Sequence, residues 1–438
     1  MMKKKGKSVI NMEELRIAQE LLKKIVEEDQ TFHDVTKALR FNKDNKEAKP
    51  LNKETVSIVS SLLGSELRHH LFLSEMTKTL KLSNDNRYLL MLALSNNFYF
   101  KRLNAKDVNA YVKKTLGEEY NEDIEKMLTH EGDLIEAFPG ESNFRQEDLI
   151  PARFNIPSYL FKMWQKHFGK GLTYKFLKKN IKPASQYLRV NLAKTSPNAL
   201  LSANPDFVKT EFEDFLTYKG TKPLRKTEEY SEYKFFNEKV GLKTVIDEVW
   251  NRDLQYVTVY SGEDDSLVRE AIMRSVGKVG LSVGLPTFET RAEILHIQRA
   301  EKPKNLNLFE VFDLGMMDAA ITNKQDLIII MPKSSSFDRI RQYPDYLMHF
   351  KQSSFDGLIA NQSLALESFA KYLDEDGQIL YIVDTLNKKE SVGVVTDFLN
   401  KHEDFKLVKW HQKFPHENED TTLFYAILAK KNSSDKDE

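Results

Sequence analysis

Two charged residues directly follow apolar, strand-like runs: Lys333 in DLIIIMPKSSS (326–336) and Asp384 in GQILYIVDTLN (377–387). A lysine at such a strand end can contact a phosphate group, and an aspartate there is expected to be a solvated carboxylate. The chain contains no cysteine, so it offers no thiolate nucleophile, no disulfide and no thiolate metal ligand. Its ten histidines show no metal-ligand spacing, so we expect no metal site.

The overall composition gives no sign of a charged partner. Lysine plus arginine (65) equals aspartate plus glutamate (65), so any binding of nucleic acid must come from local basic clusters. No apolar run approaches the length of a membrane span, and the basic start leads into a charged helix rather than an apolar segment. We therefore expect a cytoplasmic protein without a membrane partner.

The elements that must position Lys333 and Asp384 lie in the second half of the chain. Short β-branched or aromatic runs alternate there with helical patterns, which predicts an α/β fold with a doubly wound parallel sheet. The first 140 or so residues show only helical periodicity. The expected strands are 255–261, 279–285, 326–332, 378–384 and 421–428.

A polar, proline- and glycine-containing stretch at 139–151 predicts a linker between the two halves. The predicted organisation begins with an all-α domain at 1–145 and ends with an α/β domain at 236–431 and a disordered tail at 432–438.

The two segments, together with RQYPD (341–345) and FPHENEDTTLFYAILAKK (414–431), resemble the RsmB/Sun-type family, which methylates carbon 5 of a cytosine in small-subunit ribosomal RNA. In that family the first segment reads like DAPCSG and the second like YSTCS, and Lys333 and Asp384 stand at the cysteine positions. The stretches 156–171 and 185–201 also match family patterns. The resemblance implies a NusB-like helical domain at 1–145, a small α+β, ferredoxin-like domain at 152–235 and a Rossmann-like methyltransferase domain at 236–431. It also implies that an antiparallel hairpin closes one edge of the sheet.

The resemblance also implies a pocket for S-adenosylmethionine, which this sequence has lost. Val259 stands where the family has an acid at the end of the first sheet strand, and the ribose-binding acid falls on Leu285 or Pro286. Three carboxylates in the turn would repel the carboxylate of the cofactor, so we expect no cofactor. The degenerate turn consists of Gly262, Glu263, Asp264 and Asp265.

Polar and basic positions that the family uses for RNA remain, so ribosomal RNA or the small ribosomal subunit is the expected partner. A solvated loop residue is the alternative for each of them. The candidate RNA contacts are Arg189, Asn191, Lys194, Lys333, Arg339 and Arg341.

Cytosine carbon 5 is not nucleophilic until a thiolate adds to the neighbouring carbon, so a chain without thiols has lost the family's covalent route. Our interpretation is a catalytically silent homologue that binds ribosomal RNA in small-subunit assembly or on the ribosome, and not an enzyme. Two alternatives stay open. One is an active methyltransferase with a drifted site that attacks nitrogen or oxygen, and the other is a NusB-like module that binds RNA or protein.

Overall fold

The structure is a computed structural model of the chain. Its contacts divide the chain into two compact units: residues 1–183 with 339–351, and residues 184–338 with 352–438. The first residues and the predicted tail at 432–438 lie outside the described part, and the predicted domain boundaries stay predictions. The structure describes residues 12–41, 51–137, 146–220, 222–250, 253–262, 265–275, 279–285, 305–311, 313–314, 317–417 and 419–431.

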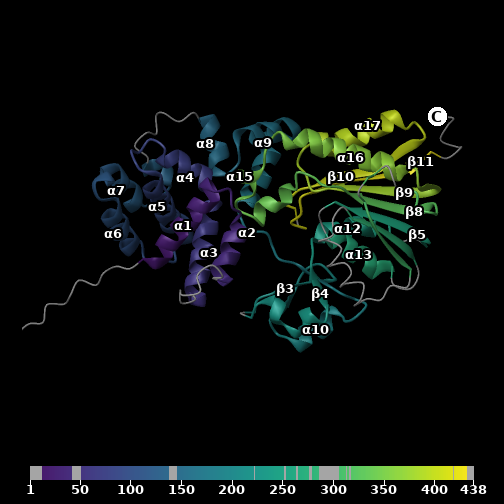
Figure 1. The fold of residues 1–438 in the computed structure, drawn as a ribbon, viewed down its shortest axis with the longest axis horizontal. Helices are drawn as coiled ribbons and strands as arrows, with labels where there is room; N and C mark the ends of the chain where they lie inside the picture. The colour runs from purple at the N-terminus through teal and green to yellow at the C-terminus, as the bar shows by residue number, and fades with distance from the viewer. Residues whose placement is uncertain are drawn as a thin grey trace, which may run out of the picture. The chain divides into compact units, whose positions relative to one another are not determined.

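The N-terminal part is helical, as its periodicity predicted (Figure 1). Asparagine and serine side chains cap several of these helices; Asn52, for example, accepts a 2.8 Å hydrogen bond from the amide of Thr55. Apolar side chains from these helices form one core, to which Leu22, Leu62 and Leu90 contribute. The helices are α1 (Glu13–Glu27), α2 (Phe32–Phe41), α3 (Lys53–Leu67), α4 (His70–Thr77), α5 (Asn84–Ser95), α6 (Ala105–Leu116) and α7 (Glu122–Thr129), with a π-helical turn at Asn96–Phe100 and 3-10 turns at Gly117–Glu119 and Leu134–Ala137.

Two further helices complete this unit. Helix α8 (Gln146–Arg153) lies partly within the predicted linker, so that prediction was wrong for these residues, and residues 138–145 are not described. Helix α9 (Ser158–Asn180) is kinked at Gly169, which has φ 77° and ψ 162°. A positive φ is easily adopted only by glycine, so Gly169 allows the chain to turn between two helical segments.

The segment at 339–351 belongs to the helical unit although it follows Lys333 in the sequence. It contains the end of a 3-10 turn (Phe337–Arg341) and α15 (Tyr346–His349). Arg341 donates hydrogen bonds to the carbonyls of Lys182 (3.2 Å) and Pro183 (2.8 Å). The carboxylate of Asp345 accepts one from the amide of Phe32 at 2.7 Å. The RQYPD motif therefore holds the segment 339–351 against the helices of this unit through hydrogen bonds.

The second unit begins with a small antiparallel sheet in the order β2-β3-β1-β4. Its apolar side chains, including Leu188, Phe207 and Phe235, form a core of their own. The elements are β1 (Leu188–Val190), α10 (Pro197–Ala203), β2 (Phe207–Lys209), β3 (Phe215–Tyr218), a 3-10 turn (Leu224–Lys226), α11 (Glu228–Ser231) and β4 (Phe235–Asn237).

A seven-stranded sheet in the order β10-β11-β9-β8-β5-β6-β7 forms the rest of this unit. Five strands are parallel, and β11 and β10 form an antiparallel hairpin at one edge, which confirms the predicted α/β fold class. The strands are β5 (Tyr256–Ser261), β6 (Gly280–Leu285), β7 (Leu306–Glu310), β8 (Gln325–Met331), β9 (Leu373–Val383), β10 (Phe405–Lys413) and β11 (Leu423–Lys430).

Helices cover both faces of this sheet because its side chains alternate between two cores. Leu327 and Ile329 of β8 pack with α12 (Val240–Asp247) and α13 (Asp265–Ser275). Ile328 and Ile330 pack with α16 (Ser354–Ala370) and α17 (Val394–Lys401), which follows a π-helical turn at Lys389–Gly393. Figure 1 shows these two pairs of helices on opposite sides of the strands.

Among the described residues, no helix is both long enough and apolar enough to cross a membrane.

Candidate functional site

The carboxyl ends of β5 and β8 meet where the strand order of the large sheet reverses, the usual ligand position in such folds. The amide of Gly262, just after β5, donates a 2.7 Å hydrogen bond to the carbonyl of Met331 in β8. A Cβ added at Gly262 would lie 2.4 Å from the amide nitrogen of Lys333. The turn after β5 therefore lies directly against the backbone of the Lys333 segment.

The side chains at this turn do not fit S-adenosylmethionine as the family is expected to bind it. Val259 is fully buried and apolar, and Leu285 ends β6, so neither side chain can accept a hydrogen bond from a ribose hydroxyl. Asp265 begins α13 and forms an ion pair with Arg269 one turn later. Glu263 and Asp264 lie outside the described residues.

Lys333 and Asp384 follow the parallel neighbours β8 and β9, so they lie at the same rim of the sheet. The side chain of Lys333 is exposed. The backbone carbonyl of Lys333 accepts a 3.0 Å hydrogen bond from the side-chain amide of Gln362. Asp384 is only 5% exposed. The expectation of a solvated aspartate was therefore wrong.

Asp384 is buried because a lysine from another part of the sequence neutralises it. Lys239 Nζ lies 2.5 Å from Asp384 Oδ2 and 2.8 Å from Asp338 Oδ2. A buried carboxylate needs such a partner, since removal of a charge from water costs several kcal/mol. The position of the family's second cysteine thus holds one member of a Lys–Asp–Asp ion-pair triad.

A second polar cluster, which the sequence analysis missed, ties the two loops together. The carboxylate of Glu390, which has no exposed surface, accepts hydrogen bonds from the amide of Ser335 (2.8 Å), Thr385 Oγ1 (2.9 Å) and Gln362 Nε2 (3.1 Å). Burial, and then the charge of Glu390, raise the pKa of Tyr381 well above its usual value, and its hydroxyl donates to the carbonyl of Glu390 at 2.9 Å. The run of serines after β8 was the available signal, because small hydroxyl side chains can satisfy buried polar groups.

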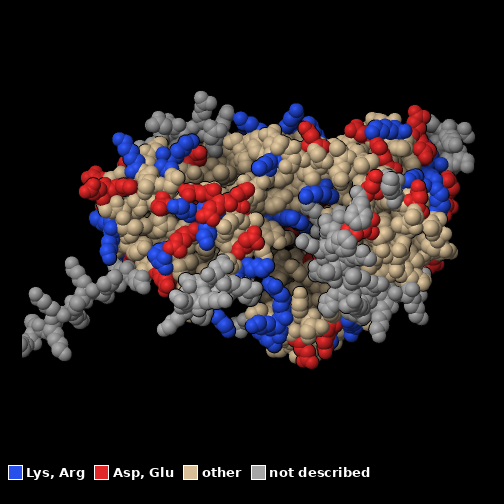
Figure 2. Space-filling model, viewed as in Figure 1, with Lys and Arg blue, Asp and Glu red and all other residues tan. Residues whose placement is uncertain are grey.

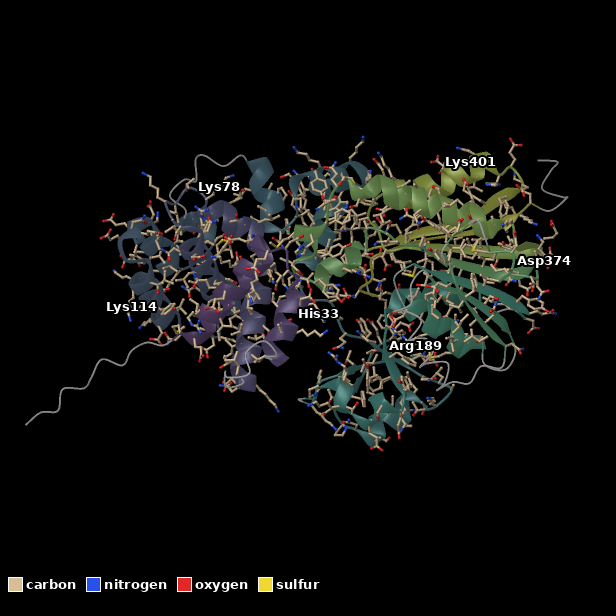
Figure 3. The ribbon with its side chains drawn as sticks, in the orientation of Figure 1. His33, Lys78, Lys114, Arg189, Asp374 and Lys401 are labelled. Carbon is tan, nitrogen blue, oxygen red and sulfur yellow. The ribbon has the colours of Figure 1, made fainter. Side chains whose placement is uncertain are left out.

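The structure gives Arg189, a predicted RNA contact, a different role (Figure 3). Its guanidinium is buried and lies 3.1 Å from a carboxylate oxygen of Asp214 and 3.3 Å from one of Glu270. Arg274 pairs with the same Glu270 at 2.6 Å; burial alone would lower the pKa of Arg274, but Glu270 and Asp247 raise it. Arg189 therefore joins a buried ionic network instead of facing solvent.

Asn191 and Arg341 are also buried and engaged within the protein. The side-chain amide of Asn191 donates a 3.1 Å hydrogen bond to the carbonyl of Tyr233 and accepts one from the amide of Ala193 at 3.2 Å. Arg341 contacts the backbone carbonyls described above. Both residues position backbone, so the structure does not support them as direct RNA contacts.

Lys194 and Arg339 are the remaining two candidates besides Lys333. Lys194 is exposed, donates to the carbonyl of Glu232 at 3.2 Å and places its ammonium 5.3 Å from the centre of the Tyr233 ring. Arg339 is partly exposed. Because Lys194 belongs to the second unit and Arg339 to the first, the six candidates do not form one patch within either unit.

Within the described ranges, no group of three or more histidine, aspartate or glutamate side chains could hold a metal ion.

Comparison with known proteins finds no family model that matches the chain. A curated relative, ribosomal RNA small subunit methyltransferase B of Xanthomonas campestris pv. campestris, is 28% identical over 116 residues, which are 24% of this chain and 26% of the relative. The chain therefore matches about a quarter of the length of that protein.

Solved structures share the architecture over a larger part of the chain. PH0851 superimposes with a TM-score of 0.70 over 95% of this chain and 98% of its own, at 16% identity. NSun6 from Pyrococcus horikoshii, solved with SFG, gives 0.54 over 63% of this chain and 99% of its own, at 14% identity. At such identities the likeness shows the fold. Together with the curated relative, it confirms the predicted resemblance to the RsmB/Sun-type methyltransferases.

Proposed function

We propose that this chain is a catalytically silent RsmB/Sun-type homologue that binds small-subunit ribosomal RNA in the cytoplasm, during subunit assembly or on the ribosome. The curated relative is named for ribosomal RNA of the small subunit, which supports RNA as the partner. The Rossmann-like fold is intact, so the chain has lost catalytic residues while it has kept the architecture of the family.

The observation that carries the proposal is the state of Asp384. Methylation at carbon 5 of cytosine requires a thiolate that adds to the neighbouring carbon, and this chain has no thiol. The carboxylate in place of the second cysteine is held by Lys239 and nearly excluded from solvent. Its function is therefore to stabilise the loops at this rim, where a nucleophile would need access to a base.

Loss of the cofactor is the second part of the proposal. Val259 and Leu285 stand where the family has hydrogen-bond acceptors for the cofactor, and neither side chain can accept. The turn at Gly262 packs closely against the backbone of Lys333. Transfer of a methyl group to nitrogen or oxygen needs no thiolate but still needs this cofactor. Cofactor binding therefore separates a silent homologue from an active methyltransferase with a drifted site.

Calorimetry with S-adenosylmethionine tests this part, with the Xanthomonas relative as the positive control. We expect no heat of binding for this chain. A dissociation constant in the low micromolar range, about −8 kcal/mol, would contradict cofactor loss and favour the drifted enzyme.

Filter binding with a small-subunit ribosomal RNA fragment tests the RNA partner. We expect saturable binding that weakens as salt rises, because phosphate contacts release counterions. A duplex DNA of equal length serves as the control. Equal affinity for both nucleic acids would reject a specific RNA partner.

A further inference from the structure

One segment of this charge-balanced chain contains no carboxylate. Residues 149–205 include neither aspartate nor glutamate, although acidic residues make up 65 of 438 overall and about eight would be expected there. Such a segment has no internal partners for its cations. Its basic residues are Arg153, Lys162, Lys166, Lys170, Lys175, Lys178, Lys179, Lys182, Arg189 and Lys194.

Helix α9 carries six of these lysines, and five of them are exposed. In its first half Leu160, Phe161 and Trp164 are buried, and in its second half Thr173, Phe176, Leu177 and Asn180 are buried. With 3.6 residues per turn, Lys162 and Lys166 point away from the buried face of the first half, and Lys175 and Lys178 point away from that of the second half. The α9 lysine face consists of Lys162, Lys166, Lys170, Lys175 and Lys178, all of them exposed.

These five lysines are not neutralised locally. In the part of the chain that the structure describes, none of the five forms an ion pair, whereas exposed lysines elsewhere do; Lys401, for example, lies 2.8 Å from Glu367. Figure 2 shows blue side chains over the region where Figure 1 places α9. The helix therefore presents uncompensated positive charge.

The kink at Gly169 changes the direction of α9 and separates these lysines into two groups. Thr173 Oγ1 donates a 2.8 Å hydrogen bond to the carbonyl of Gly169, which satisfies a group that the break in the helix leaves open. Lys162 and Lys166 precede the bend, and Lys175 and Lys178 follow it. Within each segment, lysines three or four residues apart are neighbours along the helix surface, with Cβ atoms about 5–6 Å apart.

The chemistry of this face fits a polyphosphate backbone better than a membrane or an acidic protein. A membrane-binding helix needs a free apolar face for insertion, but the large apolar side chains of α9, among them Phe161, Trp164 and Phe176, are buried. Protein interfaces are usually anchored by aromatic or arginine side chains and are depleted in lysine. Lysine rows without such anchors are typical of contacts to phosphates.

We propose that the α9 lysine face binds the phosphate backbone of RNA and is the main electrostatic contact of this protein. The inference rests on the proposed function and deepens it, because it assigns the RNA contact to residues outside the rim of the large sheet. The contact is independent of base sequence, since lysine ammonium groups recognise phosphate as point charges.

A fourfold glutamine variant of the face tests the inference in the full-length chain. The matched control removes four exposed lysines from α6 and α7, so both variants lose the same charge in helices of the same unit. The test variant carries Lys162→Gln, Lys166→Gln, Lys175→Gln and Lys178→Gln, and the control carries Lys106→Gln, Lys113→Gln, Lys114→Gln and Lys126→Gln.

Filter binding to a small-subunit ribosomal RNA fragment at several salt concentrations provides the measurement. We expect the test variant to bind at least tenfold more weakly at low salt, with a slope of log affinity against log salt lower by roughly 0.7–0.9 per lost phosphate contact. The control should stay within about twofold of the wild type. Replacing the same four residues of α9 by arginine should preserve binding, which separates loss of charge from damage to the helix.

The outcomes distinguish this inference from the proposed function. If the wild type binds the RNA and the test variant binds equally well with the same slope, only the assignment to α9 is overturned. If the wild type does not bind, the proposed function itself fails. Two results would overturn the choice of RNA as partner. One is polyglutamate that displaces the RNA with the affinity found for RNA itself, and the other is equally tight binding to phosphatidylserine vesicles that depends on the α9 lysines.

Discussion

Lys239 Nζ lies 2.5 Å from Asp384 Oδ2 although the two residues are 145 positions apart in the sequence. The same ammonium lies 2.8 Å from Asp338, so one lysine forms ion pairs with two carboxylates that are both more than 90% buried. Asp384 follows β9, and Asp338 follows the serine loop after β8. The triad therefore joins the two loops that would carry the family's cysteines.

Replacement of Lys239 by methionine should lower the free energy of unfolding by about 3–5 kcal/mol, because it leaves two buried carboxylates without their cation. Urea unfolding measures the effect. Lys401→Met is the control: it removes a lysine from an exposed pair with Glu367 and should cost no more than about 1 kcal/mol. Equal effects of the two changes would show that the triad does not stabilise this rim.

Arg189→Met should destabilise the protein, by about 3–5 kcal/mol, because it removes a guanidinium buried between Asp214 and Glu270. Lys194→Met, at an exposed position a few residues later, should change stability by less than about 1 kcal/mol. Urea unfolding compares the two variants. A stable Arg189 variant with weakened RNA binding would instead restore Arg189 as a direct RNA contact.

Gly262→Ala should destabilise the fold by about 1–3 kcal/mol, since the added methyl group would meet the backbone of Pro332 and Lys333. Gly357→Ala is the matched control in helix α16, where a Cβ meets nothing within 4 Å. It should stabilise the protein by about 0.5–1 kcal/mol, because alanine favours a helix interior. Thermal melts with calorimetric enthalpies test both changes. A Gly262→Ala variant of unchanged stability would contradict the close packing where the strand order reverses.

A buried histidine should make stability depend on pH. Burial alone would lower the pKa of His70, but the charge of Glu66 and its contact with His70 Nδ1 at 2.8 Å raise the pKa above 6.5. A proton held more tightly in the folded state stabilises the fold below pH 6.5, and this contribution is lost as pH rises through the raised pKa.

Glu66→Gln isolates this effect, because burial without the carboxylate should keep His70 neutral. The stability of wild type relative to Glu66→Gln should therefore fall as pH rises from below 6.5 to above it, by at most about 1.4 kcal/mol per pH unit. Burial lowers the pKa of neighbouring His69, and the charge of Glu66 opposes this, so a double variant that also carries His69→Gln in both backgrounds separates the effect of His70. A difference that does not change with pH would show that His70 takes up no proton on folding.

The sequence by itself determined the class of the fold and the loss of thiol chemistry. Helical periodicity in the first half and short β-branched runs in the second are local patterns, and most elements formed where these patterns predicted them. Four of the parallel strands after residue 255 follow from such patterns, and the antiparallel edge hairpin was implied by the family resemblance. The absence of cysteine needed no structure, and the acid-free segment 149–205 could also have been recognised from the sequence.

Local patterns were less informative about isolated short elements. Strands β7 (Leu306–Glu310) and β10 (Phe405–Lys413) were not among the expected strands, and α8 formed where a linker was expected. Both strands lie at the edges of the large sheet and are only partly buried, so their sequences carry a weak apolar signal.

Only the tertiary structure decided which charged residues are structural. Arg189, Asn191, Arg341 and Asp384 have the polar side chains of surface residues, yet all four are buried, with partners that include Glu270, 81 positions from Arg189, and Lys182, 159 positions from Arg341. A charge can be buried only where an opposite charge or a hydrogen-bonding group meets it. Which residues form such pairs depends on how distant segments pack, and local periodicity in the sequence does not encode this packing.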